Sequence, residues 1–385
     1  MAHCNTIFHQ MLKLIPRHHF AKLEAEHGTG RKARSFSRWS QLVHLLSMQL
    51  TARASLRDGI ASLKARFKSL YHLGVKPVAR STFADANNKR PASFFAALFA
   101  SMYRRCQPLA PKHKFKFNNK LYSLDATVVS LCLSLFPWAS FRRTRAGVKL
   151  HTLLDHDGYL PAFVAITPAR EHEIKKARTL NLPKGSIVVE DLGYTDYAWY
   201  GQLTTQKIFF VTRQKSNARY RGLGRRPVKG ALGLVSDETI QLTGAKGREC
   251  SKPLRRIVYQ DPESEKVYVF LTNHFRLAAK TIADIYKERW QIEIFFRFIK
   301  QNLKIKAFIG NSENAVLSQI YAALIVYLLL CYLKFQCNLG VTLQNLMRIL
   351  QLNLFRTCPL QELFEPPGSL PDNMNFNSQL CLAWA

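Results

Sequence analysis

Apolar residues in the first third of the chain recur every three or four positions, which is the spacing of one face of an α-helix. The clearest run is Trp39, Leu42, Val43, Leu46 and Leu50. Gly74 and Pro77 interrupt this pattern, and Ser81 can cap a further helix that follows them. The pattern predicts a small helical domain over residues 1–75 and a helical connector over residues 76–120.

From residue 121 the chain changes to short apolar runs, rich in β-branched residues, that are typical of strands. The runs before residue 205 are Leu121–Leu131, Lys149–Asp155, Phe163–Thr167 and Ile187–Val189. The runs after it are Ile208–Thr212, Thr239–Leu242, Arg255–Tyr259 and Lys266–Leu271. The first set predicts the sheet of an α/β core, and the second predicts an antiparallel β-rich insertion over residues 205–275.

Two later segments have the patterns of helices. The segment Thr281–Ile305 contains no Gly or Pro, and we expect one uninterrupted helix there. Its apolar stripe is Ile285, Ile292, Phe295, Phe296, Ile299 and Leu303. The longest apolar stretch, Ile320–Leu333, is shorter than the roughly 20 residues that a membrane span needs, so we expect a buried core helix.

The charge of the chain indicates a polyanionic partner. Its 385 residues include 56 Lys and Arg against 25 Asp and Glu, a net charge of +31, and its 47% hydrophobic composition excludes a disordered polycation. Residues 1–120 hold 22 basic and 4 acidic residues, and residues 201–275 hold 14 and 6. Nucleic acid is the favoured partner, because binding phosphates releases counterions. An anionic membrane is the alternative, which the spread of charge over two folded regions disfavours.

One basic cluster lies inside the predicted insertion. It consists of Arg213, Lys215, Arg219, Arg221, Arg225 and Arg226. Gly222 and Gly224 interrupt it, which indicates a flexible loop that contacts DNA. Elsewhere, eight scattered cysteines without a CxxC pair, and an N-terminus without an export signal, predict reduced thiols in a cytoplasmic protein.

Two acids lie at strands of the predicted sheet. Asp125 is within the run 121–131, where a buried carboxylate is costly unless it is paired or holds a cation; a partly exposed strand acid is the alternative. Asp191 follows the run 187–189, at the carboxyl end of a strand, where open α/β sheets bind ligands. Glu190 is the adjacent candidate. Because successive strand residues point to opposite faces, only one of the two can face the side of Asp125.

A third acid lies on the helix predicted from the glycine-free segment. At about 100° per residue, Tyr286, Arg289, Glu293 and Lys300 fall within an arc of roughly 60°, and Arg297 lies close to it. A carboxylate flanked by cations and a phenol could hold a metal ion and a phosphodiester together. The alternative is an ordinary surface row with an ion pair between residues four apart.

Three acids on two strands and a helix suggest metal-dependent phosphodiester chemistry. Carboxylate oxygens are the hard ligands that Mg²⁺ prefers, and two such ions can activate an attacking oxygen and stabilise a leaving one. The sequence contains no GxSxG elbow, P-loop, HExxH motif or zinc-like Cys/His spacing. His172, between Glu171 and Glu173, is the one histidine near acids, and we treat it as a loop residue that could assist the site.

The helix stripe and the two upstream acids together resemble one known family. The stripe matches the YREK signature of bacterial insertion-sequence transposases of the DDE class, the IS-four family: Tyr286-x2-Arg289-x3-Glu293-x6-Lys300. Asp125 in LYSLDATVVSL and Asp191 in VVEDLGYTD resemble the first and second catalytic aspartates of that family. The segment ARSTFADANNKR, residues 79–90, resembles the N-terminal region of one branch, so the resemblance covers nearly the whole chain.

The resemblance implies an enzyme that cleaves DNA at terminal inverted repeats and transfers the freed 3′-OH into target DNA, through hairpinned ends. Asp125, Asp191 and Glu293 would be catalytic and would bind two Mg²⁺ ions, with Mn²⁺ able to substitute. Tyr286, Arg289 and Lys300 would hold phosphates of the double-stranded DNA near the element's end, and Arg297 lies beside them. The implied protein is a homodimer on DNA, cytoplasmic and associated with the nucleoid, without a membrane partner.

The implied fold is α/β, with an RNase H-like catalytic core in which a mixed sheet is flanked by helices. The expected domains are an N-terminal all-helical DNA-binding domain (1–75), a helical connector (76–120), the first part of the core (121–204), the β-rich insertion (205–275), the second part of the core (276–340) and a C-terminal tail (341–385). Relatives stack a flipped base on a Trp of the insertion, but no Trp lies between Gly201 and Glu288. Tyr220 or Phe210 could substitute.

Two alternative functions use the same features. One is a catalytically inactive DNA-binding repressor, which the intact set of three acids disfavours. The other is an RNase H-like nuclease without strand transfer.

Overall fold

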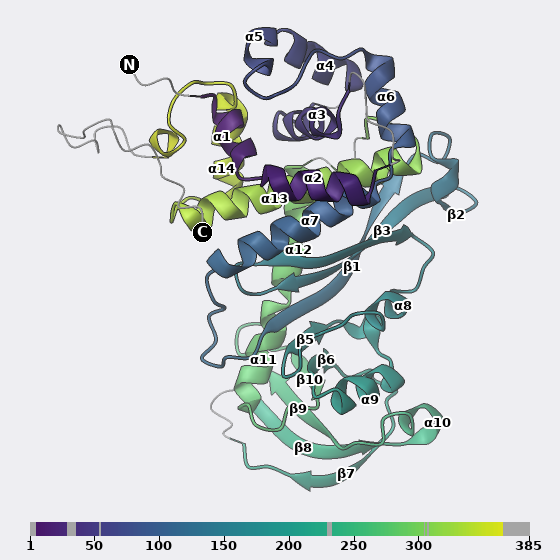
Figure 1. Ribbon diagram of the computed structural model, residues 1–385. Helices are drawn as coiled ribbons and strands as arrows, with labels where there is room; N and C mark the ends of the chain where they lie inside the picture. Colours follow the sequence, from purple (N-terminus) through teal and green to yellow (C-terminus); the bar gives the residue numbers. More distant parts are fainter. Residues whose placement is uncertain are drawn as a thin grey trace, which may run out of the picture. The chain divides into compact units, whose positions relative to one another are not determined.

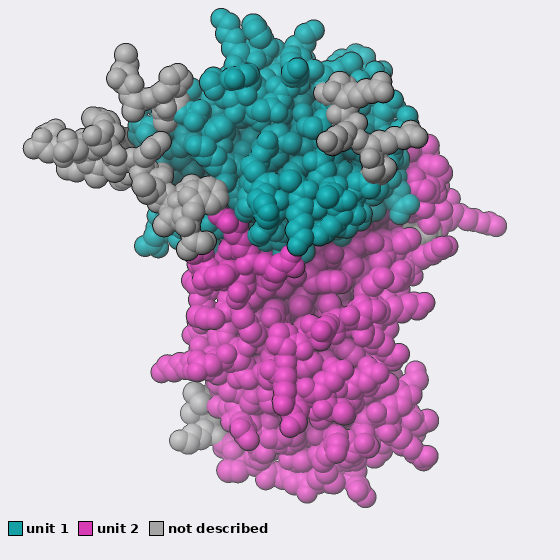
Figure 2. Space-filling model, viewed as in Figure 1, with its two compact units in different colours: residues 1–102, 302–385 teal, residues 103–301 magenta. Residues whose placement is uncertain are grey.

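The computed structural model describes residues 5–28, 36–53, 55–228, 233–303, 305 and 308–364. The chain divides into two compact units (Figure 2). Unit 1 combines residues 1–102 with residues 302–385, and unit 2 is the continuous segment 103–301. Residues 365–385 of the expected tail lie outside the described residues.

Unit 1 is built of helices (Figure 1). They are α1 (Ile7–Lys13), α2 (Arg17–Glu26), α3 (Arg38–Leu50), α4 (Leu56–Lys64), α5 (Phe67–Leu70), α6 (Arg80–Lys89), α13 (Glu313–Gln336) and α14 (Leu343–Asn353). Helix α7 (Ser93–Cys106) begins in unit 1 and ends in unit 2. Polar caps set several starts: Ser37 accepts a hydrogen bond from the amide of Ser40 at α3, and Ser312 from that of Ala315 at α13.

Helix α3 lies at the centre of unit 1, because all of its residues are buried. It packs against α4, α6 and α13. Its polar side chains have partners: Gln41 Nε2 donates to Asn87 Oδ1 at 2.8 Å, and Trp39 Nε1 donates to the Leu73 carbonyl at 2.9 Å. The helix predicted from the apolar spacing is thereby confirmed.

Among the described residues one helix, α13, is long and apolar enough to cross a membrane. Of its most apolar window, 89% is buried inside the structure, as in the core helix of a folded protein. The prediction of a buried core helix over Ile320–Leu333 is confirmed. Because α13 packs on α3 and α6, it belongs with the N-terminal helices, whereas the sequence groups residues 276–340 with the core.

The two ends of the described chain are hydrogen-bonded to each other. The amide of Ile7 donates to the Arg356 carbonyl at 3.0 Å, and the amide of Phe8 donates to the Leu354 carbonyl at 2.8 Å. The side chain of Gln10 bonds to backbone atoms of residues 358 and 360. The segment after α14 therefore closes onto α1.

Unit 2 contains one mixed sheet, with ten strands among the described residues. They are β1 (Leu121–Leu131), β2 (Ser140–Arg142), β3 (Arg145–Asp155), β4 (Leu160–Pro168), β5 (Ile187–Glu190), β6 (Phe209–Arg213), β7 (Tyr220–Arg225), β8 (Leu234–Leu242), β9 (Leu254–Gln260) and β10 (Val267–Thr272). The order is β2-β3-β1-β5-β6-β10-β9-β8-β7, with β4 on β3. Strands β5 and β6 run parallel to β1, and the other pairs are antiparallel.

Helices cover both faces of this sheet, and apolar strand residues fill the space beneath them. Side chains of α8 (Glu173–Ala177) and α9 (Tyr197–Thr205) pack with Leu124 and Phe210 on one face. Side chains of α11 (Ala279–Glu288) pack with Val189 and Val211 on the other. The short α10 (Gly244–Gly247) contacts α9, and α12 (Trp290–Gln301) contacts β1.

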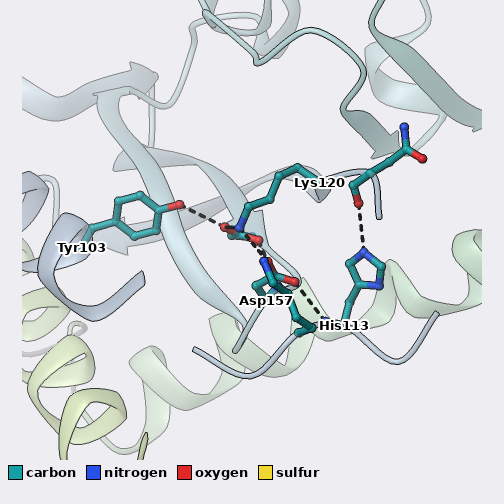
Figure 3. A network of polar contacts seen from close by, with 7 residues as sticks. Tyr103, His113, Lys120 and Asp157 are labelled. Carbon is teal, nitrogen blue, oxygen red and sulfur yellow. Dashed lines mark hydrogen bonds and ion pairs between the residues drawn. The ribbon is translucent and has the colours of Figure 1, made fainter. Parts of the chain in front are cut away.

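A network of buried charges holds the start of β1 against the end of β3 (Figure 3). Lys120 Nζ lies 2.9 Å from Asp155 Oδ2 and 2.7 Å from Asp157 Oδ2. The hydroxyl of Tyr103 donates to Asp155 at 3.1 Å, and the amide of His113 donates to Asp157 at 3.0 Å. Burial raises the pKa of Asp155 even though Lys120 opposes the rise, so this ion pair supports a carboxylate with no exposed surface.

The strands predicted from the apolar runs are all present, but two other predictions are wrong. The helix predicted from Thr281 to Ile305 breaks at Arg289, where i→i+3 hydrogen bonds tighten the backbone between α11 and α12. The predicted basic loop contains β7, an edge strand held by its backbone bonds to β8, which its Gly and Arg residues did not indicate. Strand β6, within the range 205–275, pairs with β5 and continues the core sheet.

Candidate active site

The two candidate aspartates lie at the same level of two neighbouring parallel strands, Asp125 on β1 and Asp191 directly after β5. Leu124 on β1 pairs with Glu190 on β5, so Asp125 and Asp191 each follow this pair directly. Asp191 begins the short turn η3 (Leu192–Tyr194), where its Oδ1 accepts a hydrogen bond of 2.8 Å from the amide of Gly193. The chain therefore leaves the sheet at Asp191, the second candidate acid.

Glu190, the adjacent candidate, is buried in the core. Its carboxylate has no exposed surface and lies near Tyr200, and burial raises its pKa well above the ordinary value. The charge of Asp191 acts on Asp125 and raises its pKa. Of the two neighbouring acids, Asp191 is therefore the one on the side of Asp125.

Arg289 joins Asp125 to Glu293. Its Nη1 donates to Asp125 Oδ2 at 3.3 Å, and its Nη2 donates to Glu293 Oε1 at 2.6 Å. Burial lowers the pKa of Arg289, but the hydrogen bond to Glu293 and the charge of Asp125 outweigh burial and raise it. One guanidinium, located at the break between two helices, thus neutralises an acid from the sheet and an acid from α12.

Asp125 is a largely buried carboxylate whose pKa is raised. Burial raises its pKa to about 7, and the nearby charges of Asp191 and Glu173 add to the rise. The amide of Ala126, which donates to Asp125 Oδ1 at 2.7 Å, and the charge of Arg289 oppose it. A buried acid among other acids is stabilised in its ionised form by an additional cation.

Further cations surround these acids. The guanidinium carbons of Arg213 and Arg289 lie 5.8 Å and 5.9 Å from the ring centre of Tyr286, within cation–π range. Lys300 Nζ donates to the hydroxyl of Thr127 on β1. The structure therefore brings Arg213, Tyr286, Arg289 and Lys300 to the same region as the acids, from β6, α11 and α12.

Glu173 is a carboxylate that the sequence did not assign to the site. A Cβ placed at Gly193 would lie 3.1 Å from Glu173 Oε2 and 2.9 Å from Asp191 Oδ1, so the two carboxylates flank this glycine. Glu173 Oε1 lies 3.2 Å from Lys149 Nζ. Because its charge raises the pKa of Asp125, Glu173 belongs to the electrostatic environment of the site.

The remaining basic candidates are not brought to the acids. Lys215, Arg219, Arg221 and Arg225 are exposed on or beside the edge strand β7, and Arg297 is exposed on α12. Arg226 is half-buried, and its Nη1 donates to the carbonyl of Phe275 at 2.8 Å. Apart from Arg297, these side chains form a separate basic surface on or beside the edge strand β7.

One of the two aromatic side chains considered for base stacking is inaccessible. Phe210 is fully buried, and its ring stacks on Tyr200 with centroids 4.4 Å apart, so its predicted contact with a base is wrong. Tyr220 on β7 is 38% exposed, and the guanidinium of Arg256 lies 5.1 Å from its ring centre. Tyr220 is thus the accessible aromatic residue of the two.

The chemistry of the acids suits a hard divalent cation. Asp125, Asp191 and Glu293 offer carboxylate oxygens alone, the donors that Mg²⁺ and Mn²⁺ favour. Within the described part of the chain, no three His, Cys, Asp or Glu side chains are close enough to hold an ion as they lie. Arg289 instead supplies the positive charge between Asp125 and Glu293. The donor set and the raised pKa of Asp125 fit a cation at this place.

Comparisons with protein families give two matches. A model described as a transposase DDE domain matches residues 117–329, which contain the acids and Arg289. A model described as a domain of unknown function (DUF4372) matches residues 3–76.

Several transposases are similar in sequence to this chain. One from Sinorhizobium fredii (strain NGR234) is 35% identical over 251 residues, which is 64% of this chain and 69% of that protein. The transposase for insertion sequence element IS5377 of Geobacillus stearothermophilus is 31% identical over 70% of this chain and 72% of its own length. That for element IS4SA of Synechocystis is 27% identical over 75% and 82%.

Among solved structures, the piggyBac transposase synaptic complex with hairpin DNA matches 96% of this chain and 87% of that chain, with a TM-score of 0.43 and 11% identity. This similarity is too low to support an argument about the fold.

Proposed function

The chain belongs to the transposase DDE domain family, and from that membership we propose that Asp125, Asp191 and Glu293 are its catalytic carboxylates. The protein is a DNA transposase, an enzyme that cleaves DNA and joins strands. The observation that carries the residue assignment is the bridge from Arg289 to both Asp125 and Glu293, beside Asp191 on the neighbouring strand.

Enzymes of this family use divalent metal ions, and we propose two Mg²⁺ ions here, with Mn²⁺ as a substitute. Asp125, Asp191 and Glu293 would hold them. When bound, such ions help to activate the attacking oxygen and stabilise the leaving one. The raised pKa of Asp125 supports this assignment, because a cation favours the ionised form of that carboxylate.

The cationic residues around the acids are proposed to hold the DNA backbone at the scissile phosphate. Arg289 has the planar donor pattern that fits a phosphate with two hydrogen bonds. Lys300 adds a point charge, and Arg213 and Tyr286 flank the same position. The basic surface along β7 and the exposed Arg297 are proposed as further contacts with the duplex.

Strand order supports an RNase H-like core, which we propose as the fold of strands β1 to β6 together with α11 and α12. Strands β4, β3 and β1 are antiparallel neighbours, and β5 and β6 continue the sheet parallel to β1. We propose that the β-rich stretch after β6, from β7 to β10, is an insertion in this core. The four-residue match at Tyr286, Arg289, Glu293 and Lys300 supports membership of the YREK-signature branch.

We propose that the N-terminal helices, residues 1–75, bind the terminal inverted repeats, followed by a connector over 76–120. Their charge, 22 basic against 4 acidic residues over the first 120, supports this role. Because both ends of an element must be cut, we propose a homodimer on DNA. Because a transposase acts on chromosomal DNA, we propose that the protein is associated with the nucleoid in a bacterial cytoplasm.

Incubation of purified protein with Mg²⁺ or Mn²⁺ and a duplex that carries the element's end tests these roles. The parent should nick and join DNA, and Asp125→Ala and Glu293→Ala should do neither while they retain DNA binding. Normal cutting by Glu293→Ala would refute the assignment of the acids. Nicking without joining would favour a nuclease, and binding by the parent without any cleavage would favour a repressor.

A further inference from the structure

Helix α3 ends in a tight, hydrogen-bonded turn. The amide of Arg53 donates to the Met48 carbonyl at 2.9 Å, and that of Ala52 donates to the Gln49 carbonyl at 3.4 Å, which is the bonding pattern of a Schellman motif. Ala52 has a φ of 53°, the left-handed conformation that the motif requires at this position. The turn therefore fixes the direction in which the chain leaves α3.

Helix α4 packs closely on the end of α3. Ser55 caps α4, since its Oγ accepts a hydrogen bond of 3.0 Å from the amide of Asp58. A Cβ placed at Gly59 would overlap the side chain of Met48, which shows how near the two helices lie. Leu63, one turn further along, is 1% exposed. Gly59 and Leu63 thus define the inner face of α4 and leave its opposite face to solvent.

The outer face of α4 and the following α5 are basic and aromatic. Their exposed basic side chains are Arg57, Lys64, Arg66 and Lys68. Phe67 and Tyr71 are 60% and 84% exposed, which is unusual for large apolar side chains. Asp58 is the sole acid between residues 53 and 76. Arg57, Lys64 and Lys68 form no ion pair within the described part of the chain.

Helix α3 supports this surface from behind. It is buried along its whole length, with α4 on one side and α13 on the other (Figure 1). A buried helix, a short fixed turn and a second helix with a solvent-exposed face are the parts of a helix-turn-helix, in which residues near the start of the second helix contact base edges in the major groove. Arg57 lies in that first turn of α4.

We propose that the outer face of α4 and α5 is the surface that reads the ends of the element, with α4 in the major groove of duplex DNA. This inference rests on the proposed role of the N-terminal helices and names the residues that perform it. Arg57 is placed to bond a guanine edge, and Lys64 and Lys68 are placed to contact phosphates on either side. Because the surface is positively charged, it attracts DNA and repels a second copy of this basic chain.

The test selects binding sites from a library of duplexes with a random 20-base-pair core, using the full-length protein. Arg57→Ala should select a motif that is degenerate at one or two base pairs. Arg57→Lys should recover affinity but recover the preference for those base pairs only in part, because an ammonium lacks the rigid planar fork of donors that a guanidinium presents to a guanine edge. Lys64→Ala/Lys68→Ala should select the parent motif but bind every duplex more weakly, with a salt dependence shallower by roughly one unit per lysine.

Lys184→Ala is the matched control, because Lys184 is an exposed lysine outside the N-terminal helices. It should behave as the parent does. All the substituted side chains are exposed, so unchanged thermal unfolding is expected and is measured alongside.

Four results would overturn the proposal. They are a parent that selects no motif, an Arg57→Ala variant that selects the full parent motif, a lysine variant with unchanged affinity and salt dependence, and variants that change only the self-association of the free protein. Cleavage is measured separately, with Mg²⁺ and the selected duplex. A parent that selects a motif but never cleaves it would count against the catalytic proposal and leave this surface intact.

Discussion

Nη2 of Arg289 and Oε1 of Glu293 are 2.6 Å apart, so the proposed catalytic glutamate is already paired with a cation. The same guanidinium reaches Asp125, the acid whose pKa is raised to about 7. If Asp125 and Glu293 held a divalent ion, they would need less of the positive charge that Arg289 provides. We expect the guanidinium then to be available for a DNA phosphate.

Replacement of Arg289 by lysine tests whether its two directed hydrogen bonds matter. Lysine keeps the positive charge but cannot bridge two carboxylates with a planar fork, so single-turnover cleavage should fall by about tenfold or more. The dissociation constant for DNA, measured by fluorescence anisotropy, should change much less. Arg348→Lys, on the exposed side of α14, is the control and should cleave normally. Normal cleavage by Arg289→Lys would show that positive charge at this position is sufficient and that the two directed hydrogen bonds do not matter.

The contribution of Glu173 is tested by Glu173→Gln. Removal of a negative charge beside Asp125 and Asp191 should weaken divalent-ion binding by about tenfold, the range seen when residues that support metal ligands are replaced. Isothermal titration with Mn²⁺ measures this directly, without a cleavage assay. Glu171→Gln is the control, since Glu171 pairs instead with Lys176 at 3.7 Å. An unchanged Mn²⁺ affinity in Glu173→Gln would remove Glu173 from the site.

Lys120 is expected to be important for stability. Lys120→Met leaves Asp155 and Asp157, which are 0% and 3% exposed, without their shared cation, and should cost about 3–5 kcal/mol of unfolding free energy. Lys112→Met removes a 79% exposed partner of Asp157 and should cost less than about 1 kcal/mol. Urea denaturation followed by circular dichroism gives both values. Similar losses of unfolding free energy in the two variants would show that Lys120 contributes no more to stability than the exposed Lys112.

Glu288, the last residue of α11, makes the free energy of unfolding depend on pH. Burial raises its pKa, but the hydrogen bonds from Lys114 and Tyr159 outweigh burial and lower it below the ordinary value of 4.5. A lowered carboxylate pKa stabilises the folded protein above pH 4.5, and this contribution is lost as the pH falls through the folded-state value.

Glu288→Gln should therefore lower the melting temperature most at pH 7, by an amount equivalent to about 1–2 kcal/mol. The difference from the parent should shrink as the pH falls below 4.5. Melting curves of both proteins between pH 7 and pH 3 measure it. A difference that stays constant with pH would mean that the charge of Glu288 does not matter.

Much of the core could be predicted from sequence because its strands are short apolar runs bounded by turn residues. Asp125 and Asp191 stand out for the same reason, as acids where apolar residues are expected. The break at Arg289 could not be predicted, because no Gly or Pro marks it in the sequence. The residue before it, Glu288, contacts Tyr159 and Lys114, which lie far away in the chain.

Other features were hidden by local composition. Strand β7 is exposed and rich in Gly and Arg, and only its backbone pairing with β8 makes it a strand. The sequence places Glu173 beside His172. Its position near Asp191 results from the contact of α8 with the turn at Gly193. Such contacts between distant segments leave no periodicity in the sequence.

The pairing of residues 7 and 8 with residues 354 and 356 has a consequence for the order of assembly during protein synthesis. Unit 2 is one continuous segment and can fold as soon as it emerges from the ribosome. Unit 1 is made of the first and last parts of the chain, so its earliest helices must wait for α13 and α14 to be translated. The nascent polypeptide therefore completes its catalytic sheet before the helical unit that would recognise the ends of the element.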